Sequence, residues 1–216
     1  MRQHGTVQTP PQGDTPTVRV RGEVAYDGTD FRGFALQPQV PTVAGALLDA
    51  VEQVTGERPF LTCAGRTDAG VHARAQVVSF DLPARDLDLE ALRRRVNRLC
   101  GPAVVVRDLR VAPPGFDARH DATGRSYRYR VLNSEVPDPF LARFVWQVPE
   151  PLDLRAMVAA CDPLIGEHDF SSFCRAPKVP EGQPPASLTR RVRRATWVDA
   201  GDDLLELHIE ASAFCH

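Results

Sequence analysis

The hydrophobic and polar positions of the first half of the chain switch between a strand-like and a helix-like period, which predicts alternating strands and helices. Single polar residues between apolar ones, or short apolar runs, indicate strands over residues 18–26, 59–64, 75–81 and 103–112. Two helical patterns intervene. Each begins after a residue that can cap a helix, Thr42 or Asp88, and each stops at a glycine, Gly56 or Gly101. The order is β-α-β-β-α-β, that of the ferredoxin-like or split βαβ unit.

The second half begins in the same way. Tyr127, Tyr129 and Val131 alternate with arginines and predict a strand over residues 123–133, and Asp153 can cap a helix that carries Leu154, Met157, Val158 and Cys161. Residues 191–200 and 204–212 then predict a hairpin around Gly201. The order is β-α-β-β. One more helix and one more strand would complete a repeat of the first half. A different fold for this half is the alternative that the pattern leaves open.

We therefore expect an α+β protein of two ferredoxin-like, RRM-like units. The predicted boundaries are a disordered tail over 1–16, an N-terminal unit over 17–112 and a C-terminal unit over 113–216. The loop 174–191 is too rich in proline for a helix or a central strand. It can be a mobile binding flap or an ordinary excursion, and the sequence alone does not separate the two.

Composition narrows the function classes. The formal net charge is -2, so no global basic field indicates a nucleic-acid partner, although nearly all cations are arginines, which offer a planar fork to phosphates. The five cysteines are widely spaced and form no C-x-x-C pair, which argues against a disulfide framework and a zinc module. No segment has the length or apolar character of a membrane span or signal peptide. We expect a soluble, cytoplasmic protein without a metal site.

The segment "CAGRTDAGVHARAQVVSFD" at residues 63–81 holds the most specific candidate chemistry. An Asp-Ala-Gly sequence between strands can be a simple turn. A lone aspartate can also act as a covalent nucleophile or a base, and Arg66 could keep Asp68 ionised or meet a phosphate. The small residues around it leave room for a flipped base. The spacing matches no phosphate-binding glycine motif.

This segment closely resembles the signature of the tRNA pseudouridine synthase A family. Companion segments follow the family's order along the chain, namely "YDGTDFRGF", "FDARHDATGRSYRYRVLN", "PLDLRAMVAACDPLIGEHDFSSF" and "ASAFCH". The resemblance covers residues 18–216 and implies a pseudouridine-synthase fold with a continuous, mostly antiparallel sheet. It implies isomerisation of uridine to pseudouridine at positions 38, 39 or 40 of the tRNA anticodon stem-loop, by a cytoplasmic homodimer that needs no cofactor.

The resemblance also implies roles for single residues. Asp68 matches the nucleophile, which attacks either the uracil ring or the sugar C1′. Arg66 matches an arginine that assists base flipping and pairs with the acid. Tyr127 matches a tyrosine that packs on the target base and can remove its C5 proton. The residues that match the family's tRNA contacts are Phe116, Asp117, Ala118, Arg119 and His120.

Two departures from the family pattern affect this interpretation. The family continues past the position of "AFCH" with a helix that brings a further active-site arginine, and then with a strand. Because this chain ends at His216, we expect an incomplete second unit in which Leu205, Leu207 and Ile209 lose part of their cover. The loop 174–191 is also longer than usual. The alternative function is therefore an RNA-binding protein of the same fold with little or no turnover.

Overall fold

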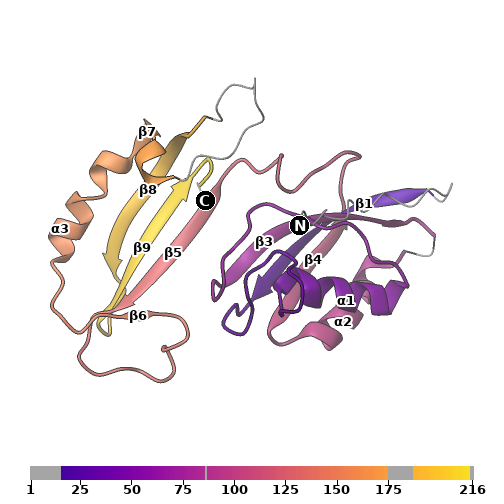
Figure 1. Cartoon of the computed structure of the whole chain (residues 1–216), viewed down its shortest axis with the longest axis horizontal. Helices are drawn as coiled ribbons and strands as arrows, with labels where there is room; N and C mark the ends of the chain where they lie inside the picture. Colours follow the sequence, from indigo (N-terminus) through magenta and orange to yellow (C-terminus); the bar gives the residue numbers. More distant parts are fainter. Residues whose placement is uncertain (1–15, 86, 175–186, 215–216) are drawn as a thin grey trace, which may run out of the picture. The chain divides into compact units, whose positions relative to one another are not determined.

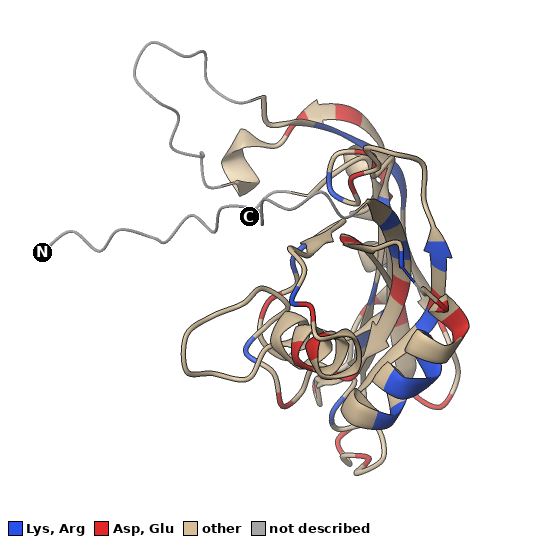
Figure 2. Ribbon diagram, turned by 90° about the vertical axis from the view of Figure 1, so that its right-hand side faces the viewer, with Lys and Arg blue, Asp and Glu red and all other residues tan. Residues whose placement is uncertain are grey.

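The computed structural model describes residues 16–85, 87–174 and 187–214, which form an α+β protein (Figure 1). The predicted tail and most of the loop 174–191 lie outside the described residues. The chain divides into two compact units, Met1–Asp121 and Ala122–His216. Basic and acidic residues are interspersed along the strands and helices (Figure 2). In the described part of the chain, no helix is long and apolar enough to cross a membrane.

The first unit has the predicted element order β-α-β-β-α-β. Its elements are β1 (Thr17–Tyr26), α1 (Val43–Thr55), β2 (Thr62–Cys63), β3 (Ala73–Pro83), α2 (Leu89–Cys100) and β4 (Val104–Val111). The strands form a sheet in the order β2-β3-β1-β4, and all neighbours are antiparallel. The predicted caps are present: Thr42 and Asp88 accept backbone N–H groups at the helix starts, and Gly56 ends α1 with a φ of 77°.

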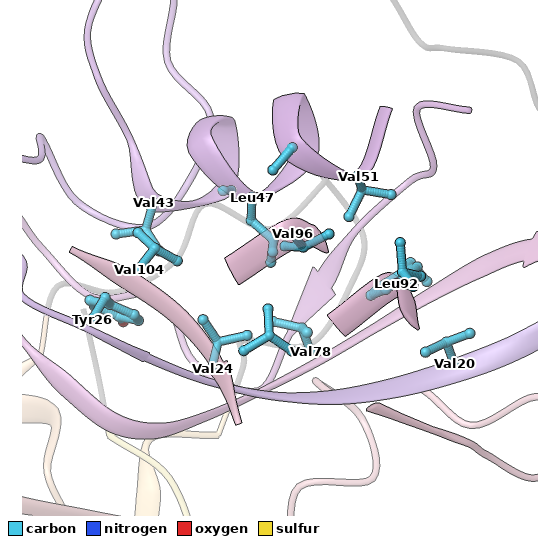
Figure 3. Packing of buried hydrophobic residues seen from close by; sticks show 14 of the residues in the cluster. Val20, Val24, Tyr26, Val43, Leu47, Val51, Val78, Leu92, Val96 and Val104 are labelled. Atoms are coloured by element: carbon cyan, nitrogen blue, oxygen red, sulfur yellow. The ribbon is translucent and has the colours of Figure 1, made fainter. Parts of the chain in front are cut away.

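The core of the first unit lies between the sheet and its two helices. Every second residue of β1 is buried from Val20 onward, as the period of two predicted. Figure 3 shows Val24 and Val78 on the strands below Leu47 of α1 and Val96 of α2, and all four are almost fully buried. The helices therefore cover one face of the sheet and leave the other face for other segments of the chain.

The second unit contains more strands than predicted. Its elements are β5 (Arg125–Leu132), β6 (Trp146–Gln147), α3 (Leu154–Ala159), β7 (Gly166–Asp169), β8 (Thr189–Asp199) and β9 (Leu204–Ala211), with 3-10 turns at Asp162–Leu164 and Ser171–Phe173. The sheet order is β6-β5-β9-β8-β7, in which only β5 and β6 are parallel. The sequence missed β6 and β7 because strands this short contain too few residues to show a period.

Helix α3 is shorter than predicted. Asp153 caps it, but the helix ends at Ala159, so Cys161 lies outside it. A 3-10 turn with a proline in its first positions follows directly and ends the α-helical hydrogen bonding. Cys161 is nevertheless buried against β8 and β9 residues, as the apolar pattern indicated.

The described strands form two sheets, one in each unit. Cys174 is disulfide-bonded, whereas the cysteine spacing argues only against a disulfide framework. A single disulfide leaves no pattern of cysteine spacing in the sequence.

The predicted hairpin of the second unit forms at Gly201, which has a φ of 83°. Leu205, Leu207 and Ile209 share one face of β9, as the alternation predicted. Leu205 is buried, whereas Leu207 and Ile209 are half-buried.

Candidate active site

Asp68 lies on the loop that joins β2 to β3, residues 64–72, here called the Asp68 loop. Its carboxylate is exposed, as is the side chain of Arg66. Within the described residues, neither side chain makes a hydrogen bond or an ion pair. Both groups therefore point to solvent, free to meet a substrate.

The segment "YDGTDFRGF" supports this loop through two glycines. A Cβ atom on Gly28 would lie 2.0 Å from the carbonyl oxygen of Val71, and one on Gly33 would lie 2.8 Å from that of Thr67. Gly33 also has a φ of 96°, a conformation that side chains other than glycine rarely adopt. The two backbones pack so closely that only glycine fits at these positions.

Hydrogen bonds hold the Asp68 loop from the same side. The hydroxyl groups of Tyr26 and Thr67 are 2.8 Å apart, and the N–H of Phe34 donates to the carbonyl of Thr67 at 3.0 Å. At the far end, His72 accepts the N–H of Gly28 through Nδ1 at 3.1 Å. The backbone on both sides of Asp68 is thus fixed while its carboxylate stays accessible.

Tyr127 belongs to the second unit, on β5. It pairs with Ile209 across the sheet, and its side chain is 37% exposed. The ring meets that of Phe214 edge to face, with centroids 4.8 Å apart. A ring that is more than a third exposed can still offer surface for stacking. Asp68 and Arg66 lie together on one unit, and Tyr127 lies on the other.

The residues from Phe116 to His120 pack on the first unit's sheet, on the face opposite to the helices. Ala118 is almost fully buried, and its N–H donates to the hydroxyl of Ser79 at 3.0 Å. Ser79 alternates with core residues of β3, so its side chain points to that open face. This anchor leaves Arg119 and His120 exposed.

Asp117 orders the turn that presents these two side chains. Its carboxylate accepts the N–H groups of Arg119 at 2.8 Å and His120 at 2.9 Å. Desolvation raises the pKa of Asp117, but these two hydrogen bonds oppose it, and the net result is a lowered pKa. Asp117 therefore acts as a turn former, and Arg119 and His120 remain as the groups able to contact a ligand.

Comparison of the sequence with known proteins identifies the family of this chain. The chain is 40% identical over 212 residues to the tRNA pseudouridine synthase A of Corynebacterium glutamicum, and the match covers 92% of this chain and 71% of the relative. It is 43% identical over 203 residues to that of Frankia casuarinae, with the same coverage. The enzyme of Thermotoga petrophila is 35% identical over 196 residues, or 91% of this chain and 78% of the relative. The chain belongs to the tRNA pseudouridine synthase A family. A scan against family models gave no match.

In this family member, a polar network on the second sheet was not foreseen from the sequence. Glu206 of β9 is almost buried, and its carboxylate lies 3.3 Å from Arg128, 3.2 Å from Arg130 and 3.1 Å from His208. These side chains occupy the face of β5 and β9 opposite to Tyr127, since neighbours along a strand point to opposite faces. The alternation in "RSYRYRVLN" predicts that Arg128 and Arg130 share one face of the strand, but only the pairing of β5 with β9 brings Glu206 to them.

The described residues contain no group of three or more histidine, cysteine, aspartate or glutamate side chains that could hold a metal ion.

A Gly28→Ala variant tests how much the Asp68 loop depends on close backbone packing. The added methyl group would overlap the carbonyl of Val71, so the loop or its neighbour must move. We expect a loss of about 1 to 3 kcal/mol of unfolding free energy, the usual range for overpacking. Thermal or urea unfolding measures it. Gly56→Ala is the control: its Cβ meets nothing within 4 Å, although its φ of 77° adds some strain. An equal or smaller loss for Gly28→Ala would contradict the packing argument.

Proposed function

We propose that this chain is a tRNA pseudouridine synthase that isomerises uridine to pseudouridine at positions 38, 39 or 40 of the anticodon stem-loop. The observation that carries the proposal is the single exposed carboxylate of Asp68, on a loop whose backbone is held by hydrogen bonds at the neighbouring Thr67. Family membership supports it, because the relatives are named tRNA pseudouridine synthase A. We propose a cytoplasmic homodimer that needs no cofactor, as the family resemblance implies; the isomerisation itself is redox-neutral.

In the proposed mechanism, Asp68 is the nucleophile. Its carboxylate adds to the uracil ring or displaces uracil at the sugar C1′, and in either case the N-glycosidic bond breaks. The detached uracil turns and forms a carbon–carbon bond from C5 to C1′. If Asp68 is bound to C1′, this attack displaces its carboxylate; if Asp68 is bound to the ring, it leaves by elimination when the C5 proton is removed. Tyr127 packs on the base, and its oxygen takes the proton from C5. Arg66 takes the space that the target base leaves in the stem and contacts the adjacent phosphate.

The segment from Phe116 to His120 binds tRNA in this proposal, with Arg119 the main phosphate contact. Its support is the anchored turn: Ala118 is fixed to Ser79, and Asp117 orders the backbone of the next residues. We further propose that the first unit, which has the β-α-β-β-α-β order and the sheet order β2-β3-β1-β4, is a ferredoxin-like unit.

The deciding experiment uses unmodified tRNA transcripts that carry uridine at position 38, 39 or 40 alone. Each is incubated with the purified chain, digested to nucleosides and analysed for pseudouridine. We expect product from at least one transcript. Binding without product would favour the alternative of an RNA-binding protein without turnover. Absence of both binding and product would refute the proposal.

An Arg119→Ala variant tests the proposed tRNA contact. Loss of one phosphate contact should weaken tRNA binding and lower the slope of log affinity against log salt by about one unit. Affinities measured across a salt series give this slope. Arg94→Ala on α2 is a matched control, since Arg94 is exposed and lies 3.5 Å from Glu90. A slope for Arg119→Ala that equals the unsubstituted chain's would show that this side chain does not contact phosphate.

A further inference from the structure

Gln76 of β3 is a buried polar side chain on the helix-covered face of the first sheet. It pairs with Val24 of the core and is 8% exposed. Both ends of the amide bond to one residue: Oε1 accepts the N–H of Gly65 at 3.3 Å, and Nε2 donates to the carbonyl of Gly65. Gly65 immediately precedes Arg66 in the Asp68 loop.

The side chain of Gln76 bonds to Gly65 at the position where the next backbone pair between β2 and β3 would otherwise form. Strand β2 pairs with β3 through Thr62 with Ser79 and Cys63 with Val78, and the N–H of Ala64 still donates to Val77 at 2.9 Å. In the same register, Gly65 would stand opposite Gln76. There the amide of Gln76 bonds to Gly65 instead, so the chain leaves the ladder at a fixed point and continues into Arg66 and Asp68.

The amide contributes to stability because it pairs the N–H and the carbonyl of Gly65, which an apolar side chain would leave without this partner. The amide also adds direction: two bonds to Gly65, the residue before Arg66, fix both its place and its orientation.

We infer that Gln76 is a positioning residue for Asp68, which acts through Gly65 to hold the carboxylate where it can attack. The inference rests on the proposed function. Gln76 does not touch the substrate. Its loss should leave tRNA binding intact and slow the chemical step, because small displacements of a reacting group are costly in rate.

The test compares Gln76→Met with a matched control. Methionine has nearly the length of glutamine and should pack among the valines, but it cannot bond to Gly65. The control is Asn97→Leu. Asn97 of α2 clamps a single residue in the same manner, through bonds of 2.9 and 2.7 Å to Val106 of β4, and neither element belongs to the Asp68 loop.

For Gln76→Met we expect kcat to fall at least about tenfold with KM for tRNA unchanged, and hydrogen exchange to speed up in peptides covering residues 64–72. Asn97→Leu should keep kcat per folded molecule even if its melting temperature falls. Gln76→Glu adds a second readout: its protonated form has the same donor and acceptor as glutamine, so its kcat relative to the unsubstituted chain should rise as pH falls.

Unchanged kcat in a folded Gln76→Met variant would overturn the inference and leave the proposed function standing. So would a loss of kcat that merely follows the unfolded fraction. If the unsubstituted chain forms no pseudouridine, the proposed function fails and the positioning role fails with it.

Discussion

The Asp68→Asn variant is expected to bind tRNA with unchanged affinity and to lose pseudouridine formation by a factor on the order of 10³ or more, the scale seen when a covalent nucleophile is removed. Asparagine has the shape of aspartate, but its amide is not nucleophilic. The exposed side chain makes no hydrogen bond or ion pair with the described residues, so the substitution should not disturb the loop.

Three measurements check this expectation: circular dichroism for folding, a binding titration with tRNA, and nucleoside analysis after a single turnover. Asp202→Asn is the matched control, because Asp202 is also exposed and sits in the turn before β9 with a φ of 51° that asparagine tolerates. If Asp68→Asn folds normally and keeps more than a trace of activity, Asp68 is not the nucleophile.

The Tyr127→Phe variant should have the second largest effect. The ring that meets Phe214 and packs on the base is kept, whereas the hydroxyl that would take the C5 proton is lost. Loss of a general base typically slows a reaction by about 10²- to 10⁴-fold, so we expect kcat to fall in that range while tRNA affinity stays within about twofold.

Tyr129→Phe is the control for this variant. Tyr129 lies two residues along the same strand, on the same face, and its ring contacts Trp146 with centroids 6.4 Å apart. It should keep full activity. Equal rates for Tyr127→Phe and the unsubstituted chain would remove proton transfer from Tyr127 and leave it a packing role only.

Elements with strong local patterns were predicted well. Helix α1 begins after Thr42 and ends at Gly56, as the cap and the glycine indicated, and β1 follows the alternation that begins at Val18. The strands β6 and β7 were missed, and α3 was predicted too long at Cys161, because such short elements depend on partners more than on their own residues.

In the candidate site, too, local features were predicted from the sequence and contacts between distant residues were not. Its chemical groups, Asp68, Arg66 and Tyr127, were named from the sequence, and their roles stay predictions. The groups that hold the Asp68 loop were not named as such. No sequence pattern links Gln76 to Gly65, Gly28 to Val71 or Ser79 to Ala118, since each pair meets only when strands or loops pack together.

By itself, the sequence determined the element order of the first unit, the helix caps and the family. These depend on residue periods, on side chains that bond to nearby backbone, and on long motifs, all of which are local. Only the tertiary structure decided the strand order, the turn that exposes Arg119 and the clamp of Gln76 on Gly65. These depend on backbone groups distant in sequence that must find hydrogen-bond partners once they are buried, and the choice of partner is settled by packing.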